Sequence, residues 1–163
     1  MLSFKILIMK LDIELLAELI KNGKNQYIIN KETGQIFEIS NKILDAVEDD
    51  YYEHLTNEEM ESAKVLKEMW EGSNKYELIP KISEGDLINI IMEIVESLDR
   101  EDNLREILME IVSTGSIHKK INYLIINYKG FYEIYDKFLT DYLKRKLKNW
   151  ALSLGFEVLE PEE

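Results

Sequence analysis

One short segment combines the residue types that an anion-binding site needs. Gly115 and Ser116 precede an expected helix start, where backbone N–H groups attract negative charge. His118, Lys119 and Lys120 follow and add an imidazole and two positive charges. The segment predicts a site for an anionic ligand, substrate or partner made by these five residues. The alternative is an ordinary helix boundary, in which Gly115 ends one helix, Ser116 caps the next and the charged side chains are solvated.

A second group of polar residues contains the residue types that bind metal ions, but their spacing in the sequence is not that of a known metal-binding motif. It offers carboxylate and imidazole ligands from Asp49, Asp50, Glu53, His54 and Glu58. Their order matches neither an EF-hand loop nor the His-Glu-x-x-His motif, so we interpret them as a solvated acidic loop. The chain has no Gly-x-Ser-x-Gly, Walker or dinucleotide motif. We therefore expect no metal, no cofactor and no catalytic residues, although the sequence does not exclude an enzyme.

Positive charge is concentrated from Lys144 to Lys148, a Lys-Arg-Lys-Leu-Lys run on the expected last helix. Such a run can bind the phosphates of a nucleic acid. Lysine and arginine late in a helix also complement its negative end and pair with nearby acidic residues. Nucleic-acid binding through this run is therefore a secondary hypothesis.

Composition favours an acidic protein of a reducing compartment. The 163 residues have a formal net charge of −12 and no cysteine, which excludes disulfides and Cys-ligated zinc. A field of that sign repels nucleic acid and anionic membranes and suits a basic partner. The apolar opening MLSFKILIMKL is shorter than the roughly 20 residues that span a membrane and lacks the features of a signal peptide. We expect a cytoplasmic protein without membrane association.

The elements that must position these residues begin with a mixed first half. Leucines and isoleucines at helical spacing predict an amphipathic helix over residues 11–20. Two β-rich runs predict a hairpin over residues 26–40, with Gly34 in its turn. Three further elements follow in chain order: a helix capped by Ser40, a helix opened by the capping box of Thr56 and Glu59, and a strand over residues 75–79 that ends at Pro80.

The second half predicts only helices. Three of them are capped by Ser83, Asp102 and Ser116, and the last runs from Phe131 to about Leu154. The fold class is therefore mainly α (α+β), a helical bundle with a small N-terminal β-hairpin or short antiparallel sheet. A single domain over residues 1–163 is the simplest organisation. The alternative within it is two lobes, residues 10–80 and 83–156.

Several segments together resemble a known family. They are residues 10–16 (KLDIELL), 27–36 (YIINKETGQI), 76–80 (YELIP) and 92–98 (MEIVESL), with Tyr135, Phe138, Asp141, Leu143, Leu147 and Trp150 in the last helix. In this order they resemble uncharacterised protein family 0158 of bacteria, over residues 10–156. The resemblance supports the fold and implies no established activity. It begins just after Met9, so residues 1–8 are expected to be an extension or a mis-assigned start.

The resemblance fails at the segment that could bind anions. The family typically has a Gly-Ala-Phe sequence there, followed by arginines and another phenylalanine. Residues 114–121 (TGSIHKKI) keep the glycine and the basic character but lose both aromatic residues. This departure puts in doubt whether the role of the segment in the family applies to this chain.

Three functions remain, and the sequence does not predict an oligomeric state. The first is a non-enzymatic interaction or regulatory domain that presents an acidic surface and exposed tyrosines to a protein partner. The tyrosines considered for that surface are Tyr51, Tyr52, Tyr132 and Tyr135. The second is a small enzyme or anionic-ligand-binding domain that uses the helix start after Gly115. The third is nucleic-acid binding through the basic run.

Overall fold

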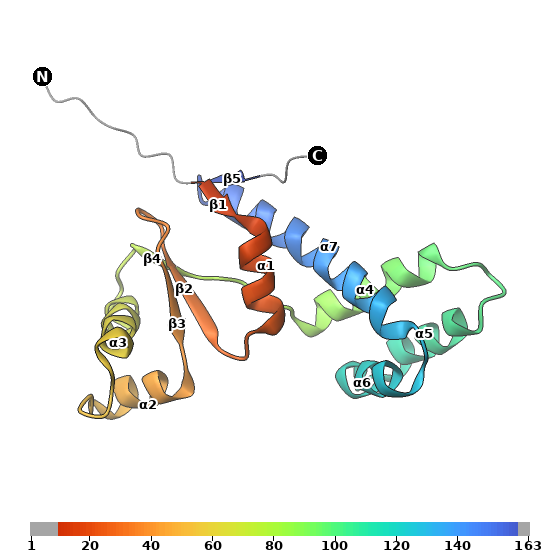
Figure 1. The fold of residues 1–163 in the computed structure, drawn as a ribbon, viewed down its shortest axis with the longest axis horizontal. Helices are drawn as coiled ribbons and strands as arrows, with labels where there is room; N and C mark the ends of the chain where they lie inside the picture. The colour runs from red at the N-terminus through yellow and green to blue at the C-terminus, as the bar shows by residue number, and fades with distance from the viewer. Residues whose placement is uncertain (1–9, 160–163) are drawn as a thin grey trace, which may run out of the picture. The chain divides into compact units, whose positions relative to one another are not determined.

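The computed structural model describes residues 10–159, so the extension expected over residues 1–8 lies outside it. The protein is mainly α with small sheets, as the sequence predicts. It forms two compact units, whose described residues are 10–80 with 148–159, and 81–147 (Figure 1). None of the helices in these residues combines the length and the apolar character that a membrane span requires.

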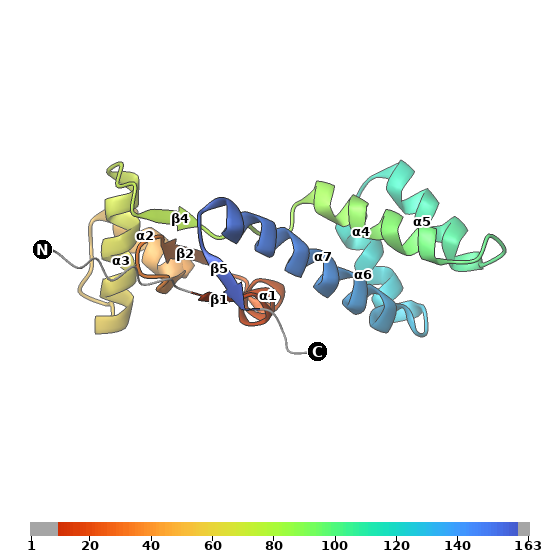
Figure 2. The same ribbon diagram turned by 90° about the horizontal axis from the view of Figure 1, so that it is seen from above.

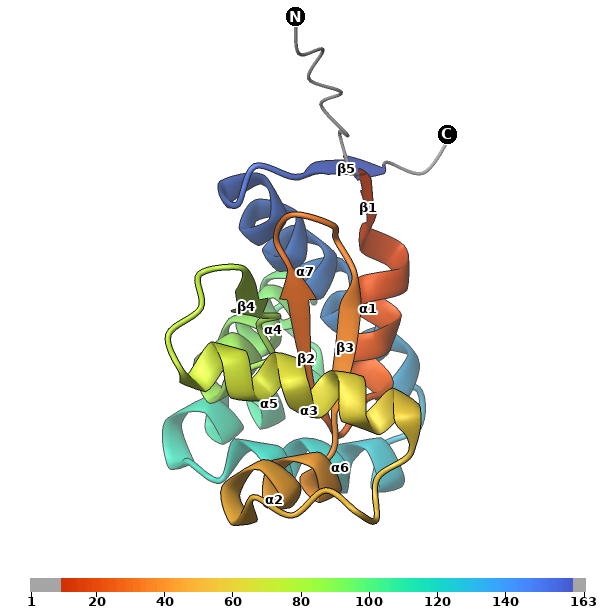
Figure 3. The same cartoon turned by 90° about the vertical axis from the view of Figure 1, so that its left-hand side faces the viewer.

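The first unit is built around a three-stranded antiparallel sheet with the strand order β3-β2-β4. Ile28 pairs with Phe37 on one side and with Leu78 on the other. Helix α1 lies along one face of the sheet, and α2 and α3 lie along the other (Figure 3). The elements of this unit are β1 (Lys10–Asp12), α1 (Ile13–Asn22), β2 (Gln26–Asn30), β3 (Ile36–Ile39), α2 (Asn41–Asp49), α3 (Asn57–Trp70), β4 (Tyr76–Leu78) and β5 (Glu157–Leu159).

Local sequence signals account for most of this unit. The predicted hairpin is present as β2 and β3, and Gly34 takes a φ of 74° in the turn, which favours glycine. The predicted caps are also present: Ser40 accepts a hydrogen bond from the amide of Ile43, and Thr56 and Glu59 form a capping box. The core between the sheet and α2 and α3 consists of Ile28, Ile39, Ile43, Ala63, Val65 and Leu66.

The start of the first helix differs from its prediction. Leu11 belongs to β1, and α1 begins only at Ile13, after Asp12 caps it by accepting from the amide of Leu15. Strand β1 pairs in parallel with β5, and Leu11 lies opposite Val158. Helical spacing alone cannot detect such a pairing, because its partner lies at the other end of the sequence.

The second unit is helical. It consists of α4 (Glu84–Ser97), α5 (Asn103–Thr114), α6 (Ile117–Asn127) and the part of α7 (Phe131–Ser153) up to Leu147. These helices pack side by side (Figure 2), and Phe131, Ile90, Ile91 and Leu108 have no exposed surface in their shared core. The predicted caps Ser83 and Asp102 accept from the amides of Asp86 and Leu104.

Candidate functional site

The segment expected to bind an anion forms the turn between α5 and α6. Gly115 has a φ of 76° and Ser116 a φ of 54°, and α6 begins at Ile117. The prediction that the Ser116 side chain caps this helix is wrong. A capping serine normally has an extended backbone that aims its hydroxyl at the first amides, whereas Ser116 is left-handed.

The basic residues of this segment do not converge. His118 and Lys119 are exposed and line no described pocket, whereas Lys120 is half-buried and donates a hydrogen bond to the Thr114 hydroxyl. Lys120 also lines a pocket of about 400 Å³ between α5 and α6. Its walls are mostly apolar and include Ile107, Ile111, Tyr123, Leu124 and Tyr128. The structure therefore brings one of the predicted charged residues to a pocket and leaves the other two on the surface.

The basic run on α7 takes part in pairing within the second unit. Both oxygens of Glu93 accept from Nη2 of Arg145, at 2.7 and 2.8 Å. The Lys146 ammonium pairs with the Asp86 carboxylate and donates to the Lys81 carbonyl oxygen at 2.9 Å. The two central charges of the run are therefore paired with protein groups, as the alternative to nucleic-acid binding expects.

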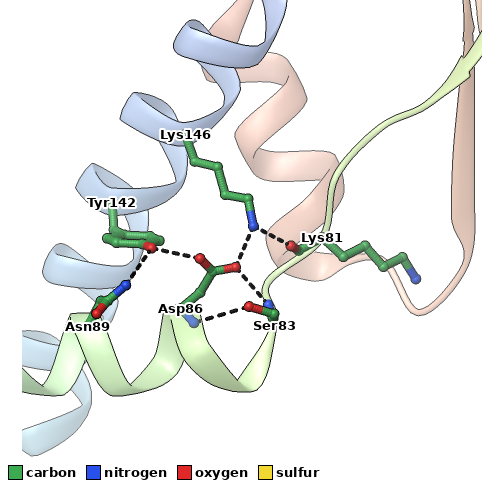
Figure 4. Close-up of polar contacts among 6 residues, drawn as sticks. All are labelled: Lys81, Ser83, Asp86, Asn89, Tyr142 and Lys146. Carbon is green, nitrogen blue, oxygen red and sulfur yellow. Dashed lines mark hydrogen bonds and ion pairs between the residues drawn. The ribbon is translucent and has the colours of Figure 1, made fainter.

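A polar cluster centred on the buried Asp86 joins the start of α4 to α7 (Figure 4). Asp86 is 8% exposed and is the third residue of α4, where it forms a capping box with Ser83. Its carboxylate accepts from the Ser83 amide at 2.8 Å, from the Tyr142 hydroxyl at 2.6 Å and from Lys146. Asn89 donates to the same tyrosine oxygen at 3.3 Å. The cluster therefore links α4 to α7 through side-chain hydrogen bonds and an ion pair.

The electrostatics of this cluster do not suit acid–base catalysis. Burial acts to raise the pKa of Asp86, but hydrogen bonds from Lys146, Ser83 and Tyr142 outweigh it and hold this pKa far below its usual value. Burial and the nearby Asp86 raise the pKa of Tyr142. A catalytic acid or base needs a pKa close to the working pH, and both groups are shifted away from neutrality. We therefore assign this cluster a structural role.

Sequence reasoning missed this cluster, although two signals for it are present. Ser83 and Asp86 have the spacing of a capping box, with aspartate in place of the usual glutamate. Tyr142 and Lys146 are four residues apart and therefore share one face of a helix. Neither signal shows that the two elements meet, because that contact depends on how the helices pack.

The acidic loop after α2 shows no metal geometry. The rings of Tyr51 and His54 stack with centroids 5.2 Å apart, and the Tyr51 hydroxyl donates to Glu53 at 3.2 Å. Over residues 10–159, no three histidine, aspartate or glutamate side chains are grouped to hold a metal ion. Of the tyrosines considered for a recognition surface, Tyr51 and Tyr132 are about half exposed and Tyr52 and Tyr135 are partly buried.

The first unit contains a groove that sequence reasoning missed. It has a volume of about 620 Å³ and runs along β3 between residues of α1 and residues of α3. Leu15 of α1 lines it and is 57% exposed. Glu38, Glu58 and Glu61 also line it, and all three are exposed. The feature therefore combines an apolar wall with carboxylates open to solvent.

Tyr27 is one of the residues that line both this groove and a second hollow of about 440 Å³ beside α1. The tyrosine is 7% exposed, and burial together with Glu38 raises its pKa. Its ring packs on Gly23 so closely that a Cβ at this glycine would lie 2.6 Å from the tyrosine oxygen. Gly23 therefore lets α1 end directly against the sheet, which positions Leu15 at the groove.

Comparisons with known proteins assign no family to this chain. No protein-family model, curated protein or solved structure matches it. The structural features that bear on function are therefore the groove beside β3 and the pocket between α5 and α6.

Proposed function

We propose that this chain is a non-enzymatic protein-interaction domain that acts in the cytoplasm and binds a protein segment in the groove beside β3. The observation that carries the proposal is the exposure of Leu15 in a groove that also presents exposed glutamates. Leu15 is 57% exposed, and burial of this apolar surface by a partner would lower the free energy of the complex. An apolar surface with a polar rim is typical of a protein-binding site.

The charge of the groove supports a basic partner. Among residues 10–159, Glu58 and Glu61 have no ion-pair partner, and the Glu38 carboxylate accepts one side-chain hydrogen bond, from Nδ2 of Asn25 at 2.6 Å. The net charge of the whole sequence is −12, which accelerates association with a positively charged partner. Lysine or arginine on the partner would therefore meet carboxylates that are still available.

The experiment compares proteins cross-linked to the wild type with those cross-linked to two groove variants, Leu15→Asp and Glu58→Lys with Glu61→Lys. We expect a stoichiometric partner that the wild type captures and both variants lose. Leu152→Asp is the matched control, since Leu152 is also half exposed but does not line the groove. Capture that is equal in all four proteins contradicts the proposal.

A second candidate function is binding of a small anionic ligand between α5 and α6. The observation that favours it is the position of Lys120, which is one of the residues that line a largely apolar pocket of about 400 Å³. Such a pocket suits a molecule with one anionic group and an apolar body. The test is calorimetry with aromatic and aliphatic carboxylates, using Lys120→Met as the variant and Lys119→Met as the control. Binding that Lys120→Met leaves unchanged rejects this candidate.

Kinship with uncharacterised protein family 0158 is likewise a proposal. The segments that support it include those that form the hairpin and the short strand β4. A solved structure of a family member tests it. We expect that structure to have the same three-stranded sheet order and an unpaired edge at the strand equivalent to β3. A different strand order contradicts the kinship.

A further inference from the structure

The hydrogen-bond pattern of the hairpin determines which backbone groups of β3 face the groove. The amide of Asn30 donates to the carbonyl of Gln35 at 2.8 Å, so this pair is hydrogen-bonded across the strands. Bonded and non-bonded pairs alternate in an antiparallel ladder, so Ile28 and Phe37 form the next bonded pair. The N–H and C=O groups of Ile36 and Glu38 must therefore point away from β2.

The edge to which these groups point is open. Strand β3 is the last strand of the order β3-β2-β4, and no strand among residues 10–159 pairs with its outer side. Four consecutive residues, from Gln35 to Glu38, line the groove, so its space extends along the length of the strand. An unpaired strand edge of this kind is a template for strand addition.

The two walls of the groove differ in chemistry. Side chains alternate across a strand, so Ile36 and Glu38 lie on the face covered by α1, whose Leu15 and Leu19 line the groove. Phe37 lies on the opposite face and packs with the core beneath α3. On that side, α3 contributes Glu58 and Glu61 to the groove. One wall is therefore mainly aliphatic and the other is acidic.

We propose that the groove binds an extended segment of a basic protein by adding it as a strand to β3. This rests on the proposed function and specifies the occupant. Aliphatic side chains of the segment contact Leu15 and Leu19, and the lysine or arginine side chains that alternate with them reach Glu58 and Glu61. The period of two follows from the strand geometry, because successive side chains of the added strand face opposite walls.

Charge disfavours a second copy of this chain as the occupant. Pairing of the β3 edges of two copies would bring Glu38 of one copy beside β3 of the other. It would also bring the acidic walls of the two copies close together. Like charges placed directly across a strand pair are destabilising. Among residues 10–159, no lysine or arginine lines the groove to compensate for them.

The test uses a short synthetic peptide in which isoleucine and lysine alternate, titrated into the full chain and followed by amide chemical shifts. We expect shifts at residues 35–38 and around Leu15. Two further peptides carry N-methyl groups on either the isoleucine or the lysine amides. Because only alternate amides of an added strand face β3, we expect one methylated peptide to bind more than about tenfold more weakly and the other to bind nearly as well.

A variant of the chain tests the same edge from the other side. Glu38→Pro removes an N–H that β2 does not use, so the hairpin keeps its ladder and the added strand loses a donor. Glu38→Gln is the matched control for the lost charge. We expect Glu38→Pro to abolish peptide binding and Glu38→Gln to retain most of it. If Glu38→Pro does not fold, the two methylated peptides still test strand addition, because they are bound to the unaltered chain.

The outcomes separate this inference from the proposed function. If both methylated peptides bind equally weakly, and the chemical-shift changes still map to the groove, strand addition is overturned. The groove then remains a docking surface, as the proposed function requires. If the alternating peptide does not bind, but a protein is captured by the wild type and lost in Leu15→Asp, the proposal that the occupant is a basic strand is overturned. If the wild type forms dimers without peptide and Glu38→Pro does not, a second copy of this chain is the occupant. This result also overturns the inference of a basic segment.

Discussion

Replacing Asp86 by asparagine is expected to destabilise the second unit by about 2–3 kcal/mol. The variant loses the charge that Lys146 pairs with and that strengthens the hydrogen bonds from Tyr142 and Ser83. A hydrogen bond to a charged group contributes about 1.5–3 kcal/mol. The Lys146 side chain is 29% exposed, so water solvates its ammonium when the ion pair is lost. The expected loss in unfolding free energy is therefore no larger than that of one hydrogen bond to a charged group.

The effect has a defined pH dependence. The pKa of Asp86 is lowered on folding from its ordinary value of 3.8, so its contribution is fully present above that value and is lost as the pH falls toward the folded pKa. The difference in unfolding free energy between wild type and Asp86→Asn should therefore be constant near neutral pH. It should narrow below about pH 4.

Urea unfolding followed by circular dichroism, at neutral pH and near pH 3, measures both quantities. The matched control is Glu84→Gln, in the same first turn of α4 but exposed, which should cost less than about 1 kcal/mol. A loss of less than about 0.5 kcal/mol for Asp86→Asn contradicts the argument, because that is the range of ordinary surface substitutions. A loss that is the same at both pH values contradicts the assigned ionisation.

Three further predictions follow from particular residues. Phe131→Ala should cost about 3–5 kcal/mol in urea unfolding, since the ring has no exposed surface in the core of the second unit, and a loss below about 1 kcal/mol contradicts this packing. Ser116→Gly should raise the melting temperature, since it relieves a left-handed backbone without removing a cap, whereas Gly115→Ala should lower it. Binding to duplex DNA should be negligible at low salt, since Arg145 and Lys146 are paired within the protein, and tight, salt-sensitive binding refutes that expectation.

Much of the fold follows from local sequence signals. Gly34 predicts the hairpin turn because its positive φ disfavours other residues, and Thr56 and Glu59 predict a helix start because their spacing satisfies two backbone amides. These signals act within a few residues of each other. The parallel pairing of β1 with β5 has no such signal, since it joins the two ends of the described chain.

The candidate sites show the same division between local and long-range information. The sequence by itself identified the residue types at Gly115–Lys120 and along the basic run, but it could not tell that His118 lies exposed or that Arg145 and Lys146 are paired. Only the tertiary structure brought Asp86 to Tyr142 and Leu15 to the open edge of β3. The physical reason is that caps and turns depend on neighbouring residues, whereas a groove exists only where separate elements pack against one sheet.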